Sequence, residues 1–339
     1  MAVWFTAGKS PMRKGQRMSS ELLYLSNADV QELKISPREA REAVLAHFRD
    51  NAAGRSIGLP KSFISIGRGS WFISMNGASE AKGIAAVKMV TVAADQENGT
   101  TSRVNGMVCV SDYRTGVPTA VLDGNSITLI RTAAMSAVAA TYLAPEAPVT
   151  IGLVGCGLQA LSHLDAFADL FPSLRRVYLL SRSTLSAERI ATAALEKRLD
   201  SIITEDPNLL LRESEIVIST VPSSPGLRSF LDARLLPSRS FAAAVDGARS
   251  WLPHTLTAFD RLVTDSVEQS RWPVDASGQY VKSTKFQDDL VHVASESLRP
   301  TAPIRALFAF QGFVIGDLAL AELAIRKARA LGIGATVPR

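Results

Sequence analysis

The residues best suited to chemistry in this sequence form a glycine-rich loop at positions 155–160, which reads Gly-Cys-Gly-Leu-Gln-Ala. An apolar run at 149–154 precedes the loop and predicts a strand, and a helical stretch follows it. In this context Gly155 permits a tight turn, Gly157 lets the backbone approach a pyrophosphate, and Ala160 keeps the helix close to the strand. The free N–H groups at the start of the helix then face the phosphates. The spacing predicts a dinucleotide site, and a structural glycine turn is the alternative.

The residues after the next predicted strand indicate which dinucleotide binds. An NAD enzyme usually carries an acid there, about 20 residues after the glycines, for the ribose hydroxyls. Here Ser181, Arg182 and Ser183 follow the apolar run 177–180, and the next acid is Glu188. A guanidinium between two hydroxyls can hold a 2′-phosphate through charge-assisted hydrogen bonds. We therefore expect NADP(H), with NAD(H) as the alternative; the structural alternative is a solvated arginine without a ligand.

Length and composition limit the class of protein. The 339 residues allow two domains of ordinary size. Hydrophobic residues make up 47% and charged residues 20%, as in a globular chain, and no uninterrupted apolar run approaches the roughly 18 residues that span a bilayer. The four histidines and two cysteines show no metal-ligand spacing, so we expect no metal site and no disulfide framework. This cysteine usage favours a reducing, cytoplasmic compartment.

Positive charge is concentrated at the start of the chain. The formal net charge is +5, and residues 1–18 contain Lys9, Arg13, Lys14 and Arg17 without any acid. The rest of the chain is nearly neutral and has no basic block of the kind that binds nucleic acid. No apolar segment follows the basic residues, as one would in a secretory signal. We interpret residues 1–18 as a basic, disordered tail, and we expect neither a nucleic-acid nor a membrane partner.

Two patterns of secondary structure surround the loop. Before it, short apolar runs with turn residues between them predict an antiparallel sheet with strands at 22–25, 63–66, 71–75, 84–92, 106–111 and 119–122. After Pro148, apolar runs alternate with helical stretches and predict parallel strands at 149–154, 177–180, 216–221, 241–245 and 262–263. The chain is therefore expected to have an α/β fold.

Three helices are expected outside the strand–helix alternation. Ser36 as N-cap, Pro37 at the first helical position and Glu39 as the capping-box partner predict a helix that ends near Gly54. Residues 26–35 before it are interpreted as a polar turn. The other two helices are expected at 128–143 and 316–331.

These features resemble the ornithine cyclodeaminase/mu-crystallin family from about Leu22 to about Gly334. The most specific segments are Ala-Val-Lys-Met-Val at 86–90, Ile-Arg-Thr-Ala-Ala-Met-Ser-Ala at 130–137, the loop 155–160, and 312–317. The resemblance implies a homodimer with a substrate cleft between two domains. Residues 131–311 would form the Rossmann dinucleotide-binding domain, and residues 19–130 with 312–339 the β-rich α+β domain for substrate binding and dimerisation.

The resemblance also implies roles for single residues. Arg131 matches the arginine that binds the substrate carboxylate, and Lys88 matches a lysine near the carboxylate and the reacting nitrogen, where it can donate a proton. Lys61 falls where many members have a second carboxylate-binding arginine, and Met75 is assigned to the same pocket. The structural alternative for each cation is a surface or packing charge. The cofactor is expected to contact Gly155, Gly157, Leu158, Gln159, Ala160, Ser181, Arg182, Ser183, Thr220, Val221 and Asp317.

Two departures from the family count against cyclisation of an amino acid. The cyclising enzymes carry a glutamate close before the catalytic lysine, whereas residues 71–77 contain no acid here. They also carry an aspartate in a Gly-Gly-Asp turn, at the position of Ala248, and Asp246 lies two residues earlier. Asp246 follows a predicted parallel strand, where it can contact the substrate amine or cap the turn.

The predicted function is NADPH-dependent reduction of the C=N bond of a small α-imino acid, either a cyclic ketimine or the imine of a keto acid and an amine. The predicted catalytic residues are Lys88, Arg131 and Asp246. An opine-type dehydrogenase of N-carboxyalkyl amino acids is the first alternative; its second carboxylate would need a further cation from Lys61, Arg103 or Arg249. Ornithine cyclodeaminase and a non-catalytic NADPH-binding protein are the others.

Overall fold

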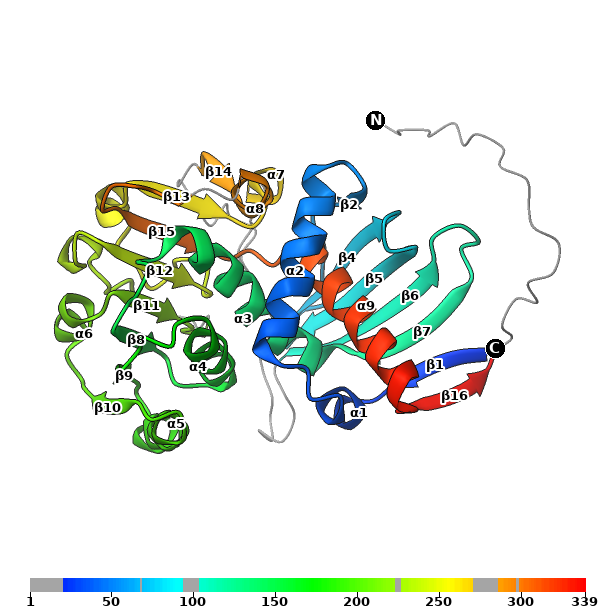
Figure 1. Ribbon diagram of the computed structural model, residues 1–339, viewed down its shortest axis with the longest axis horizontal. Coiled ribbons are helices and arrows are strands. Elements are labelled where there is room, and N and C mark those ends of the chain that lie inside the picture. Colours follow the sequence, from blue (N-terminus) through cyan, green and yellow to red (C-terminus); the bar gives the residue numbers. More distant parts are fainter. Residues whose placement is uncertain (1–20, 68, 94–103, 223–226, 271–285, 297–298) are drawn as a thin grey trace.

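The described part of the chain forms two sheets with helices between and around them (Figure 1). The computed structural model describes residues 21–67, 69–93, 104–222, 227–270, 286–296 and 299–339. The predicted basic tail at 1–18 and Arg103 lie outside these residues. A parallel sheet beside a mixed, mostly antiparallel sheet confirms the predicted α/β fold class.

The first sheet contains the strands that precede residue 124, together with the last strand of the chain. Within the described residues its order is β16-β1-β7-β6-β5-β4-β2, and β3 pairs with β4. The pairing is antiparallel except between β1 and β7, which run parallel. The strands are β1 (Glu21–Leu25), β2 (Ser56–Gly58), β3 (Ser62–Ser65), β4 (Trp71–Ser79), β5 (Ile84–Val92), β6 (Val104–Asp112), β7 (Pro118–Asp123) and β16 (Ala335–Pro338).

The second sheet is parallel throughout its described strands, as the strand–helix alternation predicts. Its order is β10-β9-β8-β11-β12-β15-β13-β14. The strands are β8 (Thr150–Val154), β9 (Arg176–Leu180), β10 (Asp200–Ile203), β11 (Ile216–Ser219), β12 (Ser240–Ala244), β13 (Arg261–Thr264), β14 (Asp288–Asp289) and β15 (Arg305–Ala309). Because all of them point the same way, their carboxyl ends lie along one edge, where open α/β sheets bind ligands.

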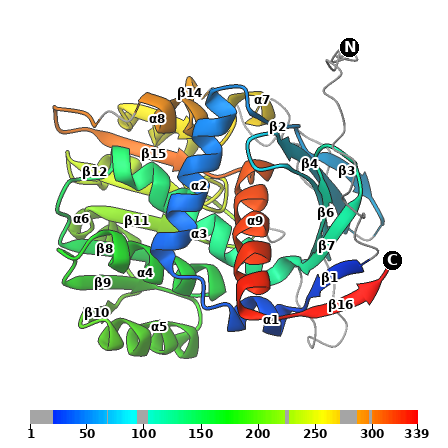
Figure 2. The ribbon, with the colours of Figure 1, turned by 45° about the vertical axis from the view of Figure 1, so that its right-hand side comes forward.

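Three helices lie between the two sheets and position the site: α2 (Pro37–Ala52), α3 (Gly124–Leu143) and α9 (Val314–Leu331) (Figures 1 and 2). The predicted capping box at the start of α2 is present, since Ser36 and Glu39 exchange hydrogen bonds. The other helices are α1 (Asn27–Glu32), α4 (Leu158–Leu170), α5 (Thr184–Glu196), α6 (Pro207–Glu213), α7 (Val267–Ser270), α8 (Leu290–Glu296) and the 3₁₀ turns η1 (Ala233–Leu235) and η2 (Pro253–Ala258).

Several predicted boundaries were wrong, each for a local reason. Residues 26–35 contain the short helix α1 rather than a simple turn, because Ser26 and Asp29 form a second capping box. The helix expected from residue 128 begins at Gly124, because the Asp123 side chain accepts the N–H of Asn125. The domain boundaries at 130–131 and 311–312 stay predictions.

Helix α3 is the described helix with the length and apolar composition needed to cross a membrane. The protein interior buries 78% of its most apolar window. It packs against α2, α4 and α9, as expected for the core helix of a globular protein.

Candidate active site

Lys88, Arg131 and Asp317 meet between the two sheets, on three different elements. Lys88 projects from β5, is fully buried, and donates from Nζ to Asp317 Oδ1 at 2.7 Å and to Thr128 Oγ1 at 2.6 Å. Arg131 on α3 places Nε 3.2 Å from the same carboxylate oxygen, which the first turn of α9 provides. The ring of Phe310 packs against the guanidinium, 4.9 Å from its central carbon. The structure thus brings together two residues predicted to bind substrate and one predicted to bind cofactor.

Lys61 reaches the same place from the segment between β2 and β3. Its Nζ donates to the carbonyl of Gln311, the second residue after β15. A Cβ on Gly312 would lie 2.8 Å from Lys61 Nζ and 3.3 Å from Arg131 Nη1, and Gly312 has φ +87°. Glycine at this position therefore satisfies a left-handed backbone and lets two cations approach. We call Lys61, Lys88, Arg131, Asp265 and Asp317 the cation cluster.

Asp265 is a member of the cation cluster that the sequence analysis missed. It follows β13 directly, is fully buried, and accepts the backbone N–H groups of Gln311 and Gly312. An acid directly after a parallel strand is a signal that could have identified it, because ligands bind at that edge of such sheets. The strand was predicted, but its last residue was placed at Val263, so Asp265 was not considered.

Burial and charge set the proton affinities in the cation cluster. The pKa of Lys61 and that of Lys88 are both lowered to about 8, chiefly by burial and in part by the charge of Arg131. The neighbouring carboxylates oppose this shift. Burial also raises the pKa of Asp265, while Lys61 and the two N–H groups lower it. Among the described residues, the cation cluster contains three basic and two acidic side chains, a formal excess of one positive charge.

Met75 and Asp246 have different surroundings, although both were predicted to serve the site. Met75 on β4 is buried and pairs in register with Lys88, so it borders the cation cluster. Asp246 accepts from the hydroxyls of Ser219 and Ser250 and from the N–H of Ala248. Among the described residues it shares no ion pair or hydrogen bond with the cation cluster. These contacts are those of a turn cap, and its catalytic role stays a prediction.

The predicted phosphate loop has the geometry that a dinucleotide needs. Gly155 has φ +87°, and a Cβ there would lie 3.1 Å from the Thr220 hydroxyl, so the turn excludes a side chain. A Cβ on Gly157 would meet no atom within 4 Å, which leaves the backbone open to a ligand. Helix α4 starts at Leu158 without a side-chain cap on its free N–H groups. The residues therefore fit a pyrophosphate at this helix start.

Other predicted cofactor residues line the carboxyl ends of the neighbouring strands. Ser181 and Arg182 follow β9, and Ser183 is the N-cap of α5, accepting the N–H of Ser186. Arg182 is exposed. Thr220 follows β11 and donates to the carbonyl of Gly155 at 2.9 Å. All of these positions lie on the same edge as Asp265 and Gly312, because β9, β11, β13 and β15 are parallel strands of one sheet.

Predicted residues not yet placed fall into two groups. Val221 lies two residues beyond β11, because this strand ends at Ser219 rather than at the predicted residue 221. Gln159 and Ala160 lie in the first turn of α4; Ala160 is fully buried against the core, as its predicted packing role requires, and Gln159 Oε1 is buried with no hydrogen-bond partner among the described residues.

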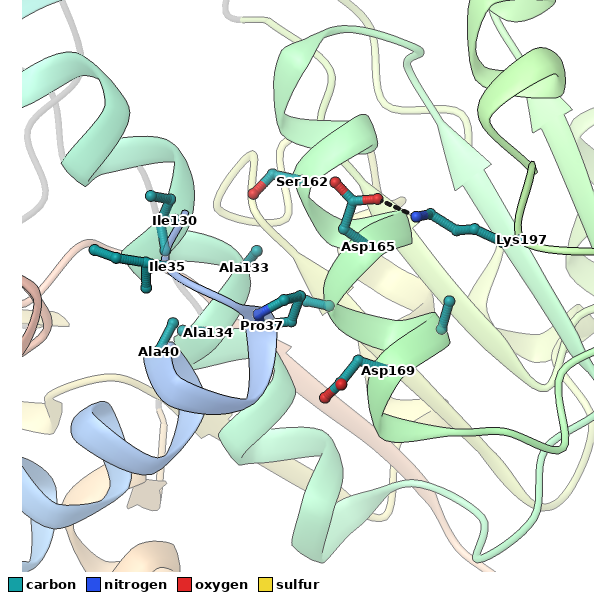
Figure 3. Close-up of a pocket in the computed structure, with 12 residues that line it drawn as sticks. Ile35, Pro37, Ala40, Ile130, Ala133, Ala134, Ser162, Asp165, Asp169 and Lys197 are labelled. Atoms are coloured by element: carbon teal, nitrogen blue, oxygen red, sulfur yellow. Dashed lines mark ion pairs between the residues drawn. The ribbon is translucent and has the colours of Figure 1, made fainter. Parts of the chain in front are cut away.

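A separate cavity of about 480 Å³ is lined by residues of α2, α3 and α4, and no member of the cation cluster lines it. Figure 3 shows residues of α2, α3 and α4 around it, with Asp165 in an ion pair with Lys197. Its α3 residues are Ile130, Ala133 and Ala134, whereas Arg131 contacts Asp317 and Phe310 instead. Its carboxylates are paired with cations, so this cavity offers no charge to a carboxylate substrate, and the cation cluster is the better candidate site.

Comparison with known proteins places this geometry in a family. The pattern of the ornithine cyclodeaminase/mu-crystallin family matches residues 21–233. A Delta(1)-pyrroline-2-carboxylate reductase of Bacillus cereus is 25% identical over 269 residues, which cover 76% of this chain and 82% of the relative.

Solved structures show the same fold over nearly the whole chain. The Thermococcus litoralis Delta(1)-pyrroline-2-carboxylate reductase in complex with NADH and L-proline has a TM-score of 0.82 at 23% identity, covering 93% of this chain and 100% of that one. An archaeal alanine dehydrogenase dimer with bound NAD has a TM-score of 0.82 at 23% identity, and the match covers 94% of this chain and 99% of that one.

Proposed function

The chain belongs to the ornithine cyclodeaminase/mu-crystallin family, and from this premise we propose that it reduces the C=N bond of small α-imino acids with NADPH as hydride donor. It is an NAD(P)-dependent oxidoreductase of that family. The observation that carries the proposal is the cation cluster, which holds one excess positive charge beside the carboxyl ends of the parallel strands. A substrate with one carboxylate neutralises that charge.

The carboxylate of the substrate binds at Arg131 and Lys61, whose nitrogens converge on Gly312. A guanidinium can hold a carboxylate through two parallel hydrogen bonds and so fixes the neighbouring α-carbon. When bound, the reduced nicotinamide supplies the hydride to that carbon. Glycine at position 312 lets both cations approach the backbone, because a Cβ there would lie 2.8 Å from Lys61 Nζ and 3.3 Å from Arg131 Nη1.

Lys88 supplies the proton that the reduced nitrogen requires. Its pKa of about 8 lets it be protonated at neutral pH and still release a proton. Asp317 holds Nζ in place and favours the protonated form. The second oxygen of Asp317 has no hydrogen-bond partner among the described residues, so it can accept an N–H from a bound molecule.

One carboxylate fits the cation cluster better than the two carboxylates of an opine-type substrate. Arg249, one of the cations considered for a second carboxylate, lies beside Asp246 rather than in the cluster. Arg103 lies outside the described residues. A second buried carboxylate would turn the excess positive charge into an excess negative one, at a cost that no described cation offsets.

NADPH is proposed over NADH because of the residues that follow β9. Exposed Arg182 between Ser181 and Ser183 offers a cation and hydroxyls to a 2′-phosphate, and no acid stands there for the ribose. We expect Arg182→Ala to raise the KM for NADPH roughly tenfold and to leave that for NADH within about twofold. Arg189→Ala, also exposed on α5, is the matched control. An equal rise of the KM for NADPH and for NADH in Arg182→Ala would contradict the proposed preference for NADPH.

A homodimer is proposed from one face of the first sheet. Ile57, Leu59, Ala78 and Val87 share a surface with Cys109, and its lining residues carry no charge. Ile57 is 53% exposed and Leu59 51% exposed. A second copy would cover this apolar surface. Light scattering should show a dimer that Val87→Glu dissociates and that Leu185→Glu on α5 does not; a monomeric wild type would end this proposal.

The cytoplasm remains the proposed compartment. Both cysteines are free thiols, one buried and one half-buried, as expected in a reducing environment.

The function is tested by NADPH oxidation with a panel of substrates. The panel contains the cyclic ketimines pyrroline-2-carboxylate and piperideine-2-carboxylate, pyruvate or glyoxylate with several amines, and ornithine with NAD⁺. We expect oxidation with a cyclic ketimine. Activity only with a keto acid plus an amino acid would favour the opine-type enzyme, and release of ammonia from ornithine would favour the cyclodeaminase. Tight NADPH binding without turnover of any substrate would contradict the enzyme proposal.

A further inference from the structure

We propose that Asp265 is a positioning residue that fixes the turn Phe310–Gly312 and thereby directs Lys61 and Arg131 at the substrate carboxylate. The inference rests on the function proposed above for its catalytic consequences. Asp265 does not need to touch the substrate for this role. Its contacts, its neighbours in the turn and its charge each support it.

Asp265 binds the turn through the backbone. One of its carboxylate oxygens accepts both the Gln311 N–H, at 3.0 Å, and the Gly312 N–H. Its neighbour Thr264 donates to the carbonyl of Ala309 at 2.9 Å. Gln269 Nε2 donates to the carbonyl of Gly312 at 3.3 Å. The end of β13 and helix α7 thus hold the turn after β15 from residue 309 to residue 312.

The same turn contacts both carboxylate-binding cations. Gln311 offers its carbonyl to Lys61 Nζ. Phe310 lies under the guanidinium of Arg131, with 4.9 Å from the ring centre to the central carbon. The Cα of Gly312 faces both cations, with space for no side chain. A shift of the turn by about 1 Å would misplace both cations at once, and such errors cost roughly a hundredfold in rate.

The charge of Asp265 acts on Lys61 as well. Lys61 faces Asp265, Asp317, Arg131 and Lys88; the two acids favour its protonated form, and burial and Arg131 oppose it. Asp265 is the larger of the two favourable influences on the pKa of Lys61. Removing this charge should therefore lower the pKa of Lys61 below about 8, and Lys61 would lose its proton closer to neutral pH.

Two substitutions separate the two contributions of Asp265. Asp265→Asn keeps an oxygen that can accept both N–H groups and removes the charge. We expect kcat to stay within about threefold, KM to rise roughly tenfold, and the rise of KM with pH to begin at a lower pH. Asp265→Ala removes the acceptor too, and we expect both kcat and KM to worsen, with kcat/KM lower by roughly a hundredfold. Asp169→Asn, whose acid lines the separate cavity and pairs with Arg41, is the control and should behave as wild type.

A stability measurement, which needs no substrate and no turnover, distinguishes failure of this inference from failure of the proposed function. Thermal stability is followed by calorimetry from about pH 6 to about pH 10. A lysine with a lowered pKa in the folded state makes stability rise with pH, from its folded toward its unfolded pKa. Asp265→Asn should start this rise at lower pH, and Lys61→Met should remove part of it. If Asp265→Asn and Asp265→Ala both keep the KM, the pH profile and the stability profile of wild type, the inference is wrong. If no imino acid is reduced but the stability profile shifts as described, the Asp265–Lys61 link stands and only the substrate proposal fails.

Discussion

Two buried aspartates stand at equivalent places in the parallel sheet and have different partners. Asp246 follows β12 and Asp265 follows β13, and both strands pair with β15. The oxygens of Asp246 accept from hydroxyl groups and from an N–H of its own turn. Asp265 accepts from the turn after β15 and faces Lys61. One carboxylate closes a turn, and the other supports a group of cations.

The difference between the two strand ends, after β12 and after β13, shows that the partners of a buried aspartate indicate its role. Hydroxyl and N–H donors satisfy Asp246 and leave no charged side chain of the cation cluster beside it. Asp265 belongs to a set of charges with one cation in excess, so the set still attracts an anion. We therefore expect substitutions near Asp265 to weaken substrate binding, and substitutions near Asp246 to lower stability alone.

The largest effect is expected at Arg131. Arg131→Met should lower kcat/KM for a cyclic ketimine by roughly a thousandfold, or about 4 kcal/mol, because the carboxylate loses a buried charged partner. Steady-state kinetics measure this change. Arg41→Met, which breaks an ion pair with Asp169 beside the separate cavity, should leave kcat/KM within about threefold. Equal losses for both variants would mean that Arg131 does not bind the carboxylate.

A paired glycine substitution contrasts the two turns directly. Gly312 and Gly247 both have a left-handed backbone, with φ +87° and φ +67°. An alanine at either position costs about 1 kcal/mol of stability or more from backbone strain. Gly312→Ala should also lower kcat/KM by roughly a hundredfold, because its methyl group would stand 2.8 Å from Lys61 Nζ. Gly247→Ala should lower only the melting temperature. Similar losses of kcat/KM in both variants would contradict the claim that only the turn at Gly312 supports catalysis.

The pH dependence of binding and of stability should have opposite signs. Lys61 and Lys88 have folded-state pKa values of about 8, below the ordinary 10.5. Above pH 8 they lose their protons, so the KM for the imino acid should rise by roughly tenfold per pH unit. The free energy of unfolding should rise over the same range, because the unfolded chain still binds those protons. A KM that is flat up to pH 10 would mean that neither lysine binds the carboxylate in its charged form.

The smallest catalytic effect is expected at Asp246. Asp246→Asn should lower the free energy of unfolding by about 1–3 kcal/mol, because its amide cannot accept every hydrogen bond that the carboxylate accepts. Denaturant unfolding measures this loss. We expect kcat/KM to change by less than about threefold. A loss of turnover with normal stability would instead support the catalytic role that the sequence predicted.

The phosphate loop could be predicted from the sequence because it is contiguous. Strand, glycines and helix start lie within about a dozen residues, and the backbone geometry of Gly155 follows from local sterics. The capping box of α2 was predicted for the same reason. The sequence also indicated both sheets, since the period of apolar residues changes near residue 148.

The cation cluster could be predicted only in part. Lys88 and Arg131 were found through a family resemblance rather than through their spacing, and their shared partner Asp317 was assigned to the cofactor. Asp265 and Phe310 directly follow two other strands, β13 and β15, and their approach to Lys61 depends on how the sheets pack. A carboxylate at a strand end looks the same in the sequence whether hydroxyls or cations surround it. The strand before Asp265 was also predicted to end at Val263, one residue too early, so Asp265 was not recognised as a residue at a strand end.

The central claim is that the buried excess charge selects a substrate with one carboxylate. The most direct test compares NADPH oxidation with piperideine-2-carboxylate and with the same cyclic imine without its carboxylate. We predict that kcat/KM for the carboxylate is higher by roughly a thousandfold in wild type, and that Arg131→Met reduces this ratio to near one. Equal rates with both imines in the wild type would contradict the account.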